Sequence, residues 1–194
     1  MIFLTGEHGA GKTHLAQVYQ KHFGCEYVDL GPTLRRIWME TSPNTSFADF
    51  LKRGEEKSGI DFTNQLLVDE IEKQMGRRAE NCCTGRLLII GSRSVQGLQY
   101  IRGKTQDING NTRAVVYIQA DEDKLYLHYK EREQREISYQ EFQLLLQRDR
   151  QMGILGIRGV ADYVIENNDN ALAFEKRGIE IFNQILNTPK KVRG

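Results

Sequence analysis

The segment at residues 6–13 constrains the fold of this chain more than any other feature of its sequence. It reads GEHGAGKT and fits the pattern G-x-x-x-x-G-K-[ST]. A short apolar run at residues 1–5 precedes it. Leu15, Tyr19 and Phe23 follow it at a spacing of four, which places them on one helical face. We therefore expect a buried strand, a tight glycine-rich turn and then a helix.

Each residue type in this turn, called the P-loop below, suits the binding of a nucleoside triphosphate. Glycines allow backbone N–H groups to curl around a β-phosphate, and the following helix directs its positive end at the same anion. We expect Lys12 to bridge the β- and γ-phosphates and to be catalytic, and the Thr13 hydroxyl to hold Mg²⁺. His8 occupies a variable position, so its side chain is expected to face solvent. The expected ATP-binding residues are Gly6, Gly9, Ala10, Gly11, Lys12 and Thr13.

The rest of the chain alternates short apolar runs with helical patterns. Strands are predicted at residues 1–5, 25–30, 86–90, 114–118 and 163–165, and helices at 12–24, 33–39, 47–57, 62–75, 121–136, 138–152 and from 169 onward. The run LLII at 87–90 is apolar on both faces, as in a central parallel strand. No linker or repeat interrupts the chain. These patterns predict a single α/β domain over residues 1–194, with helices on both sides of a parallel sheet.

Composition excludes several classes of protein. The 194 residues include 27 Lys and Arg against 26 Asp and Glu, a net charge of +1, which argues against a nucleic-acid-coating protein. No apolar run is long enough to span a membrane, and the N-terminal residues lack the layout of a signal peptide. Cys25, Cys82 and Cys83 are odd in number and lack metal-site spacing. We expect a cytoplasmic, reduced protein with no nucleic-acid or membrane partner.

Several motifs resemble the nucleoside monophosphate kinase group, which includes adenylate kinases and dephospho-CoA kinases. Residues 31–35 (GPTLR) are similar to the G-D-x-L-R motif of adenylate kinases, and residues 91–93 (GSR) stand in place of their D-G-F-P-R motif. The tail from 148 to 167 resembles that of a dephospho-CoA kinase or an archaeal relative, with a last strand of the form A-D-x-x-I-x-N. The resemblance implies a P-loop fold in three α/β/α layers with a five-stranded sheet of order 2-3-1-4-5.

The resemblance also implies roles for four arginines. Arg35 and Arg93 follow the second and third predicted strands, where they would fork onto an acceptor phosphate. Arg132 and Arg135 fall in a lid at residues 128–150 that would close over the transferring phosphoryl group, although alternating charges also suit a solvated helix face. Residues 31–76 would form an acceptor-binding flap. The implied activity is an ATP- and Mg²⁺-dependent kinase acting on a nucleoside monophosphate or dephospho-CoA.

One departure leaves the catalytic assignment open. Adenylate kinases carry an Asp that helps to organise Mg²⁺ where this chain has Ile90. Either Mg²⁺ rests on Thr13, phosphates and water, or Asp29 at the end of the second strand substitutes. Asp29 would also suit a hydroxyl acceptor, which must lose a proton, or would simply cap the turn that follows it. The departure permits an alternative function, a nucleotide-binding regulatory ATPase without a small acceptor.

Overall fold

The structure is a computed structural model that describes residues 1–59, 61–79, 87–105, 114–134 and 136–187. Its centre is a five-stranded, all-parallel sheet in the order β2-β3-β1-β4-β5, as predicted. The strands are β1 (Ile2–Thr5), β2 (Glu26–Asp29), β3 (Leu87–Ile90), β4 (Ala114–Gln119) and β5 (Tyr163–Glu166). The helices are α1 (Lys12–Phe23), α2 (Leu30–Thr41), α3 (Phe47–Ser58), α4 (Phe62–Ala79), α5 (Val95–Lys104), α6 (Glu122–Glu133), α7 (Tyr139–Gln151), α8 (Ile154–Arg158) and α9 (Ala171–Asn187).

Alternation along the strands builds a core on each face of the sheet. Ile2 and Leu4 of β1 pack with buried residues of α1, α6, α7 and α9, whereas Phe3 between them packs with α4, α5 and α8. Because successive side chains of a strand point to opposite faces, β1 contributes to both cores and is buried throughout. The predicted three-layer α/β/α arrangement is confirmed.

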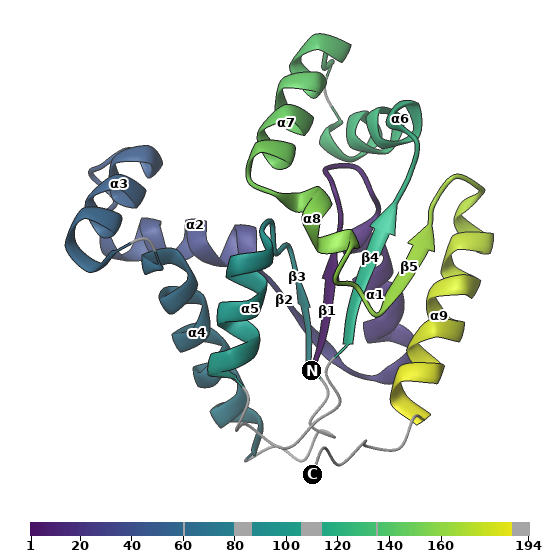
Figure 1. The fold of residues 1–194 in the computed structure, drawn as a ribbon, viewed down its shortest axis with the longest axis horizontal. Coiled ribbons are helices and arrows are strands. Elements are labelled where there is room, and N and C mark those ends of the chain that lie inside the picture. Colours follow the sequence, from purple (N-terminus) through teal and green to yellow (C-terminus); the bar gives the residue numbers. More distant parts are fainter. Residues whose placement is uncertain (60, 80–86, 106–113, 135, 188–194) are drawn as a thin grey trace.

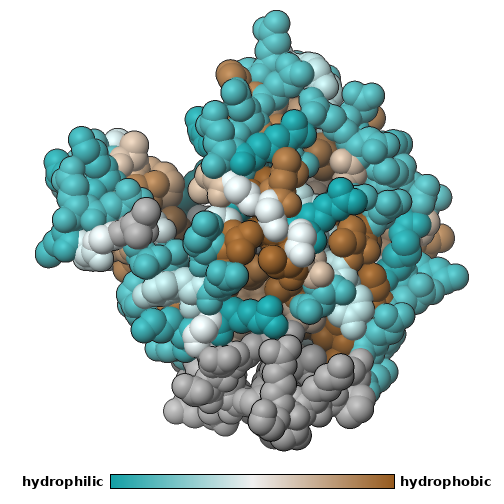
Figure 2. All heavy atoms as spheres, viewed as in Figure 1, coloured by the Kyte–Doolittle hydropathy of each residue, from teal (hydrophilic) through white to brown (hydrophobic). Residues whose placement is uncertain are grey.

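The carboxyl ends of the strands gather at the edge of the sheet that carries the P-loop (Figure 1). Helices α6 and α7 lie above this edge in the view, and α2 and α3 project to one side of it. Figure 2 shows a hollow between the projecting α3 and the α6–α7 region. Ligands of open parallel sheets bind beyond the carboxyl ends of the strands, so this hollow adjoins the expected substrate site.

Several local predictions need correction. Helices α5 and α8 were not predicted, and α4 continues through Gly76 to Ala79 instead of ending at Gly76. Leu172, expected on the apolar face of the last helix, is 77% exposed because α9 buries Phe174, Gly178, Phe182 and Ile185 instead. Helix α9 begins at Ala171 instead of at Asp169, and Asn170 caps its first turn, its Oδ1 accepting from the Ala173 N–H.

Other local predictions are confirmed. Gly24 ends α1 in the left-handed conformation, with φ of 63°, and Ser138 and Glu141 form the predicted capping box of α7. Cys25 is a free, buried thiol, and Cys82 and Cys83 lie outside the described residues. Within the described ranges, no helix has the length and apolarity needed to cross a membrane.

Candidate active site

The backbone of the P-loop forms a cradle and requires glycine at three positions. Gly6, Gly9 and Gly11 have φ of 150°, 79° and 97°. A Cβ on Gly6 would collide with the carbonyl oxygen of Ile118, and one on Gly9 with that of Leu125. The loop therefore needs both the conformational freedom and the small size of glycine, and its backbone N–H groups are available to an anion.

Lys12 lies inside this cradle at the start of α1. Its Nζ donates hydrogen bonds to the carbonyl oxygens of Gly6 and Glu7, both at 2.8 Å. Burial lowers the pKa of Lys12 to about 8, with the charge of Arg93 acting in the same direction and that of Asp149 opposing it. The ammonium group is thus held on the loop by carbonyl oxygens, in a position from which it can turn to a phosphate.

Two further elements hold the P-loop from outside. Asn167, which follows β5, is buried and donates from Nδ2 to the carbonyl oxygen of Ala10 at 3.0 Å. On α6, Nδ1 of His128 lies 3.1 Å from the carbonyl oxygen of Gly9. An unpaired carbonyl would be costly to bury, so these contacts fix the shape of the cradle.

Helix α7 presents a buried carboxylate to the same loop. Asp149 is 2% exposed, and its Oδ2 accepts from the backbone N–H of His8 at 3.1 Å and lies 2.6 Å from His8 Nδ1. Its other oxygen, Oδ1, lies 3.4 Å from Nη1 of Arg93. Burial disfavours the ionised form, but the hydrogen bond from His8 and the positive charges of Arg93 and Lys12 prevail and lower the pKa of Asp149. An ionised, buried acid therefore connects α7, the P-loop and Arg93.

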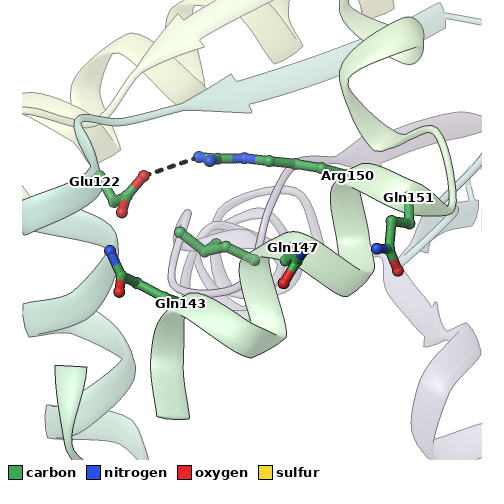
Figure 3. A pocket seen from close by; sticks show the side chains of 6 residues that line it. Glu122, Gln143, Gln147, Arg150 and Gln151 are labelled. Carbon is green, nitrogen blue, oxygen red and sulfur yellow. Dashed lines mark hydrogen bonds and ion pairs between the residues drawn. The ribbon is translucent and has the colours of Figure 1, made fainter. Parts of the chain in front are cut away.

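The next residue on α7, Arg150, makes a second link to the P-loop, in which α7 supplies the positive charge and the loop the negative one. Arg150 donates from Nε to Oε1 of Glu7 at 2.7 Å and from Nη2 to Oε2 of Glu122 at 3.1 Å. Figure 3 shows the Arg150–Glu122 pair across one side of a pocket between α6 and α7. This pocket has a volume of about 450 Å³, and its lining consists of Glu122, Gln143, Leu146, Gln147, Arg150 and Gln151. Arg150 thus faces the pocket and the P-loop together.

Asp29 lies at the carboxyl end of β2, where it pairs in register with Ile90 of β3. Its Oδ1 accepts from the N–H of Gly31 and caps α2, as one of the alternatives from the sequence predicted. Burial raises the pKa of Asp29, against the opposing effects of the Gly31 hydrogen bond and of Lys12, Arg132 and Arg93. The sheet order places β2 two strands from β1, roughly 10 Å away at the usual strand spacing.

The oxygen donors of the site fit Mg²⁺ bound together with a nucleotide. Mg²⁺ takes one or two protein oxygens and completes its shell with phosphates and water. The Thr13 hydroxyl at the start of α1 and the Asp29 carboxylate are such donors. Across the described ranges, no group of three or more His, Cys, Asp or Glu side chains is arranged to hold a metal ion without such help.

The four arginines predicted for the site do not share one location in the structure. Arg93 lies beside Asp149 and His8, at the P-loop. Arg35 is exposed on α2, while its neighbour Arg36 is the residue that ties α2 to α4, through Glu70 at 2.8 Å. Arg132 on α6 stacks over the Tyr129 ring at 4.9 Å and pairs with Glu133. Arg135 lies outside the described residues.

Sequence reasoning missed several contacts of this site, namely those that Asn167, His128 and Arg150 make with the P-loop and the pair formed by His8 and Asp149. It placed the His8 side chain in solvent, which is wrong, because the imidazole is bonded to Asp149. It also treated Asp149 only as part of a charged helix. A signal was present, since Phe142, Leu146 and Asp149 follow the spacing i, i+4, i+7 and share the buried face of α7. An acid on an apolar helical face needs a partner, which here is 141 residues away.

Comparison with solved structures establishes the fold. Shikimate kinase from Acinetobacter baumannii in complex with shikimate superposes with a TM-score of 0.54 and 19% identity, over 95% of this chain and 92% of that one. TT1252 from Thermus thermophilus gives a TM-score of 0.60 at 17% identity, over 96% and 97%. A gluconokinase from Sinorhizobium meliloti gives 0.54 at 11% identity, over 95% and 94%. The fold is that of the P-loop kinases.

Sequence comparison finds only distant relatives. A UPF0200 protein of Saccharolobus islandicus is 26% identical over 192 residues, which cover 96% of this chain and 94% of the relative. A UPF0200 protein of Saccharolobus solfataricus matches equally well. No family model matches the chain.

Proposed function

We propose that this chain is a kinase that transfers the γ-phosphate of ATP, bound with Mg²⁺, to a nucleotide-like small molecule. A nucleoside monophosphate and dephospho-CoA are the two acceptors that its motifs favour. The observation that carries the proposal is the glycine-built cradle with Lys12 hydrogen-bonded inside it, and with Arg93 beside Asp149 and His8 at the same loop. Burial lowers the pKa of Lys12 to about 8. Perturbed ionisable groups at the mouth of a phosphate cradle are typical of a phosphoryl-transfer site.

Each part of the candidate site has its own role in the proposed phosphoryl transfer. Backbone N–H groups of the P-loop hold the β-phosphate, and Lys12 turns from the carbonyl oxygens of Gly6 and Glu7 to the phosphates. Arg93 and the exposed Arg35 bind the acceptor, Arg35 from the flap formed by α2 to α4. Arg132 and Arg135 of the lid at residues 128–150 neutralise the migrating charge. When bound, Mg²⁺ would supply charge stabilisation on the phosphate oxygens, with Thr13 and Asp29 as its oxygen donors from the protein.

One observation favours a second candidate, a regulatory ATPase. Strand β3 is entirely buried and apolar up to Ile90, so it offers no carboxylate at the position where adenylate kinases have their Asp. A P-loop protein that binds nucleotide but transfers phosphate slowly is consistent with that feature. Such a protein would hydrolyse ATP at the same rate whatever small molecule is added.

Release of ADP from Mg²⁺ and ATP separates these candidates. The assay is run with each nucleoside and deoxynucleoside monophosphate, with dephospho-CoA and with no acceptor. Lys12→Ala is the control for a contaminating kinase. The proposal expects one acceptor to accelerate ADP release and the acceleration to disappear in Lys12→Ala. Slow hydrolysis that no acceptor changes would contradict it and favour the regulatory ATPase.

A further inference from the structure

The hydrogen bonds of His8 fix the orientation of its imidazole. Nδ1 lies 2.6 Å from the ionised carboxylate of Asp149, an acceptor, so Nδ1 carries a proton and donates it. Nη2 of Arg93, which has only protons to offer, lies 3.5 Å from Nε2. Nε2 therefore presents a lone pair toward Arg93. The ring is further confined by an edge-on contact with Tyr129, at 5.8 Å between centroids.

The location of this lone pair suits a catalytic role in the proposed reaction. His8 belongs to the P-loop itself, so its ring is attached to the backbone that surrounds the phosphates. Its Nε2 contacts Arg93, which the proposed function assigns to the acceptor, so an acceptor bound by Arg93 would lie beside this nitrogen. The His8 side chain is 19% exposed. An imidazole oriented by a buried carboxylate through one nitrogen, with the other nitrogen on the side of the substrate, is the arrangement that activates hydroxyl groups in other enzymes.

We propose that His8, oriented by Asp149, is the general base of the reaction and that the group phosphorylated is therefore a hydroxyl. This inference rests on the proposed kinase function and narrows its acceptor class. An acceptor phosphate is already ionised at neutral pH and needs no base, whereas an alcohol must lose a proton. The choice favours dephospho-CoA, or another alcohol that carries an anionic group, over a nucleoside monophosphate attacked at its phosphate.

The step balances without any further reactant. A lone pair of the acceptor oxygen forms the new bond to the γ-phosphorus, while the bond from that phosphorus to the β–γ bridging oxygen breaks. The bridging electron pair leaves with ADP. The hydroxyl proton passes to His8 Nε2, and the imidazolium returns it to solvent after the products form. His8 is the catalytic residue in this step, and Asp149 is a positioning residue that acts through it.

Asp29 is the competing base, and its position makes it the weaker candidate. It lies at the end of β2, two strands from the strand that leads into the P-loop. One oxygen of its carboxylate, Oδ1, also accepts the Gly31 N–H at the start of α2. These features suit a group that orients the acceptor or Mg²⁺, whereas His8 is part of the phosphate cradle.

The experiment compares turnover with nucleotide binding in four variants. His8→Ala, Asp149→Asn, the double variant and Asp29→Asn are assayed with Mg²⁺, ATP and each of two acceptor sets. One set offers hydroxyls (dephospho-CoA, shikimate and gluconate), and the other offers phosphates (AMP and CMP). The dissociation constant of ATP is measured by calorimetry for each variant. His22→Ala, an exposed histidine on α1, is the matched control.

The proposal expects His8→Ala to lower turnover with a hydroxyl acceptor roughly 100- to 1000-fold while ATP affinity changes less than about threefold. Added imidazole should restore part of the rate, which a purely structural role would not permit. Asp149→Asn should lower turnover less than His8→Ala, and the double variant should be no slower than His8→Ala, because the two residues act as a unit. His8→Ala carries the test if Asp149→Asn fails to fold.

Three results would overturn this inference and leave the kinase function intact. They are full turnover in His8→Ala, a loss of ATP binding in parallel with turnover that imidazole does not rescue, and acceleration by AMP or CMP alone. A larger loss in Asp29→Asn than in His8→Ala would transfer the role of base to Asp29. ADP release that does not depend on Lys12 would instead contradict the proposed function itself.

Discussion

Arg150 of α7 donates a hydrogen bond from Nε to Oε1 of Glu7 in the P-loop, at 2.7 Å. The same guanidinium binds Glu122 at the start of α6, so one side chain of α7 joins the P-loop to α6. We expect Arg150→Ala to raise the Michaelis constant for ATP several-fold, because the loop loses a support beside the phosphates. The pair is partly exposed, so the free energy of unfolding should fall by only about 0.2–1 kcal/mol.

Arg148, which is also exposed and lies two residues earlier on the same helix, is the matched control. Arg148→Ala removes the same charge without touching the P-loop. Steady-state kinetics over a range of ATP concentrations should separate the two variants. Equal Michaelis constants for ATP in both would mean that the Arg150–Glu7 bond does not support nucleotide binding.

Gly9 tests the steric basis of the cradle. Its φ is 79°, and a Cβ there would collide with the backbone carbonyl of Leu125. Gly9→Ala should therefore destabilise the fold by roughly 1–3 kcal/mol and abolish measurable ATP binding. Gly103→Ala near the end of α5 is the contrasting change, since a Cβ there meets nothing within 4 Å and should stabilise the helix by about 0.5–1 kcal/mol. Chemical denaturation measures both effects, and retention of ATP binding by Gly9→Ala would contradict this account of the loop.

Asp29 should show a conflict between stability and activity. Burial raises the pKa of its carboxyl, so at neutral pH the ionised group is less favourable in the folded than in the unfolded chain. Asp29→Asn removes this cost and can still cap α2, so it should unfold at a higher temperature at pH 7. The advantage should shrink as the pH falls through the raised pKa and vanish below the ordinary value of 3.8, where both states are protonated. Thermal unfolding of both proteins from pH 3 to pH 8 checks the sign, and a less stable variant at pH 7 would refute it.

The same substitution should lower kinase activity, since Asp29 is among the oxygen donors proposed for Mg²⁺ or the acceptor. A variant that is more stable and less active is the signature of a residue kept for function.

The sheet could be predicted from the sequence because its central strands β1, β3 and β4 are short and largely apolar runs, and the pattern of residues 6–13 fixes how the first strand continues. Helix α8 was missed because it is only five residues long, too short to show a helical period. Only the local part of the candidate site could be predicted from the sequence. Local spacing identified the P-loop and Lys12, whereas the bonds of Asp149 to His8 and of Arg150 to Glu7 join residues more than 140 positions apart. Only the folding of α7 onto the P-loop creates them.

Arg35 tests the assignment of the flap. It is exposed on α2, and its neighbour Arg36 makes the ion pair between α2 and α4. Arg35→Ala should therefore raise the Michaelis constant for the acceptor about tenfold or more and leave ATP affinity and the unfolding temperature unchanged. Kinetics in which the acceptor and ATP are varied separately make the distinction. Equal weakening of both substrates would show that Arg35 does not read the acceptor.

The fate of the γ-phosphate is the most direct test of the central claim, that this site transfers phosphate to a small molecule. Phosphorus NMR of a reaction containing the protein, Mg²⁺, ATP and the acceptor that most accelerates ADP release would follow it. The account predicts a new resonance of the phosphorylated acceptor, an ester for a hydroxyl or an anhydride for a phosphate, that grows as the γ-phosphate signal of ATP declines, and no such resonance with Lys12→Ala. Inorganic phosphate as the sole product would contradict the claim and identify the protein as an ATPase.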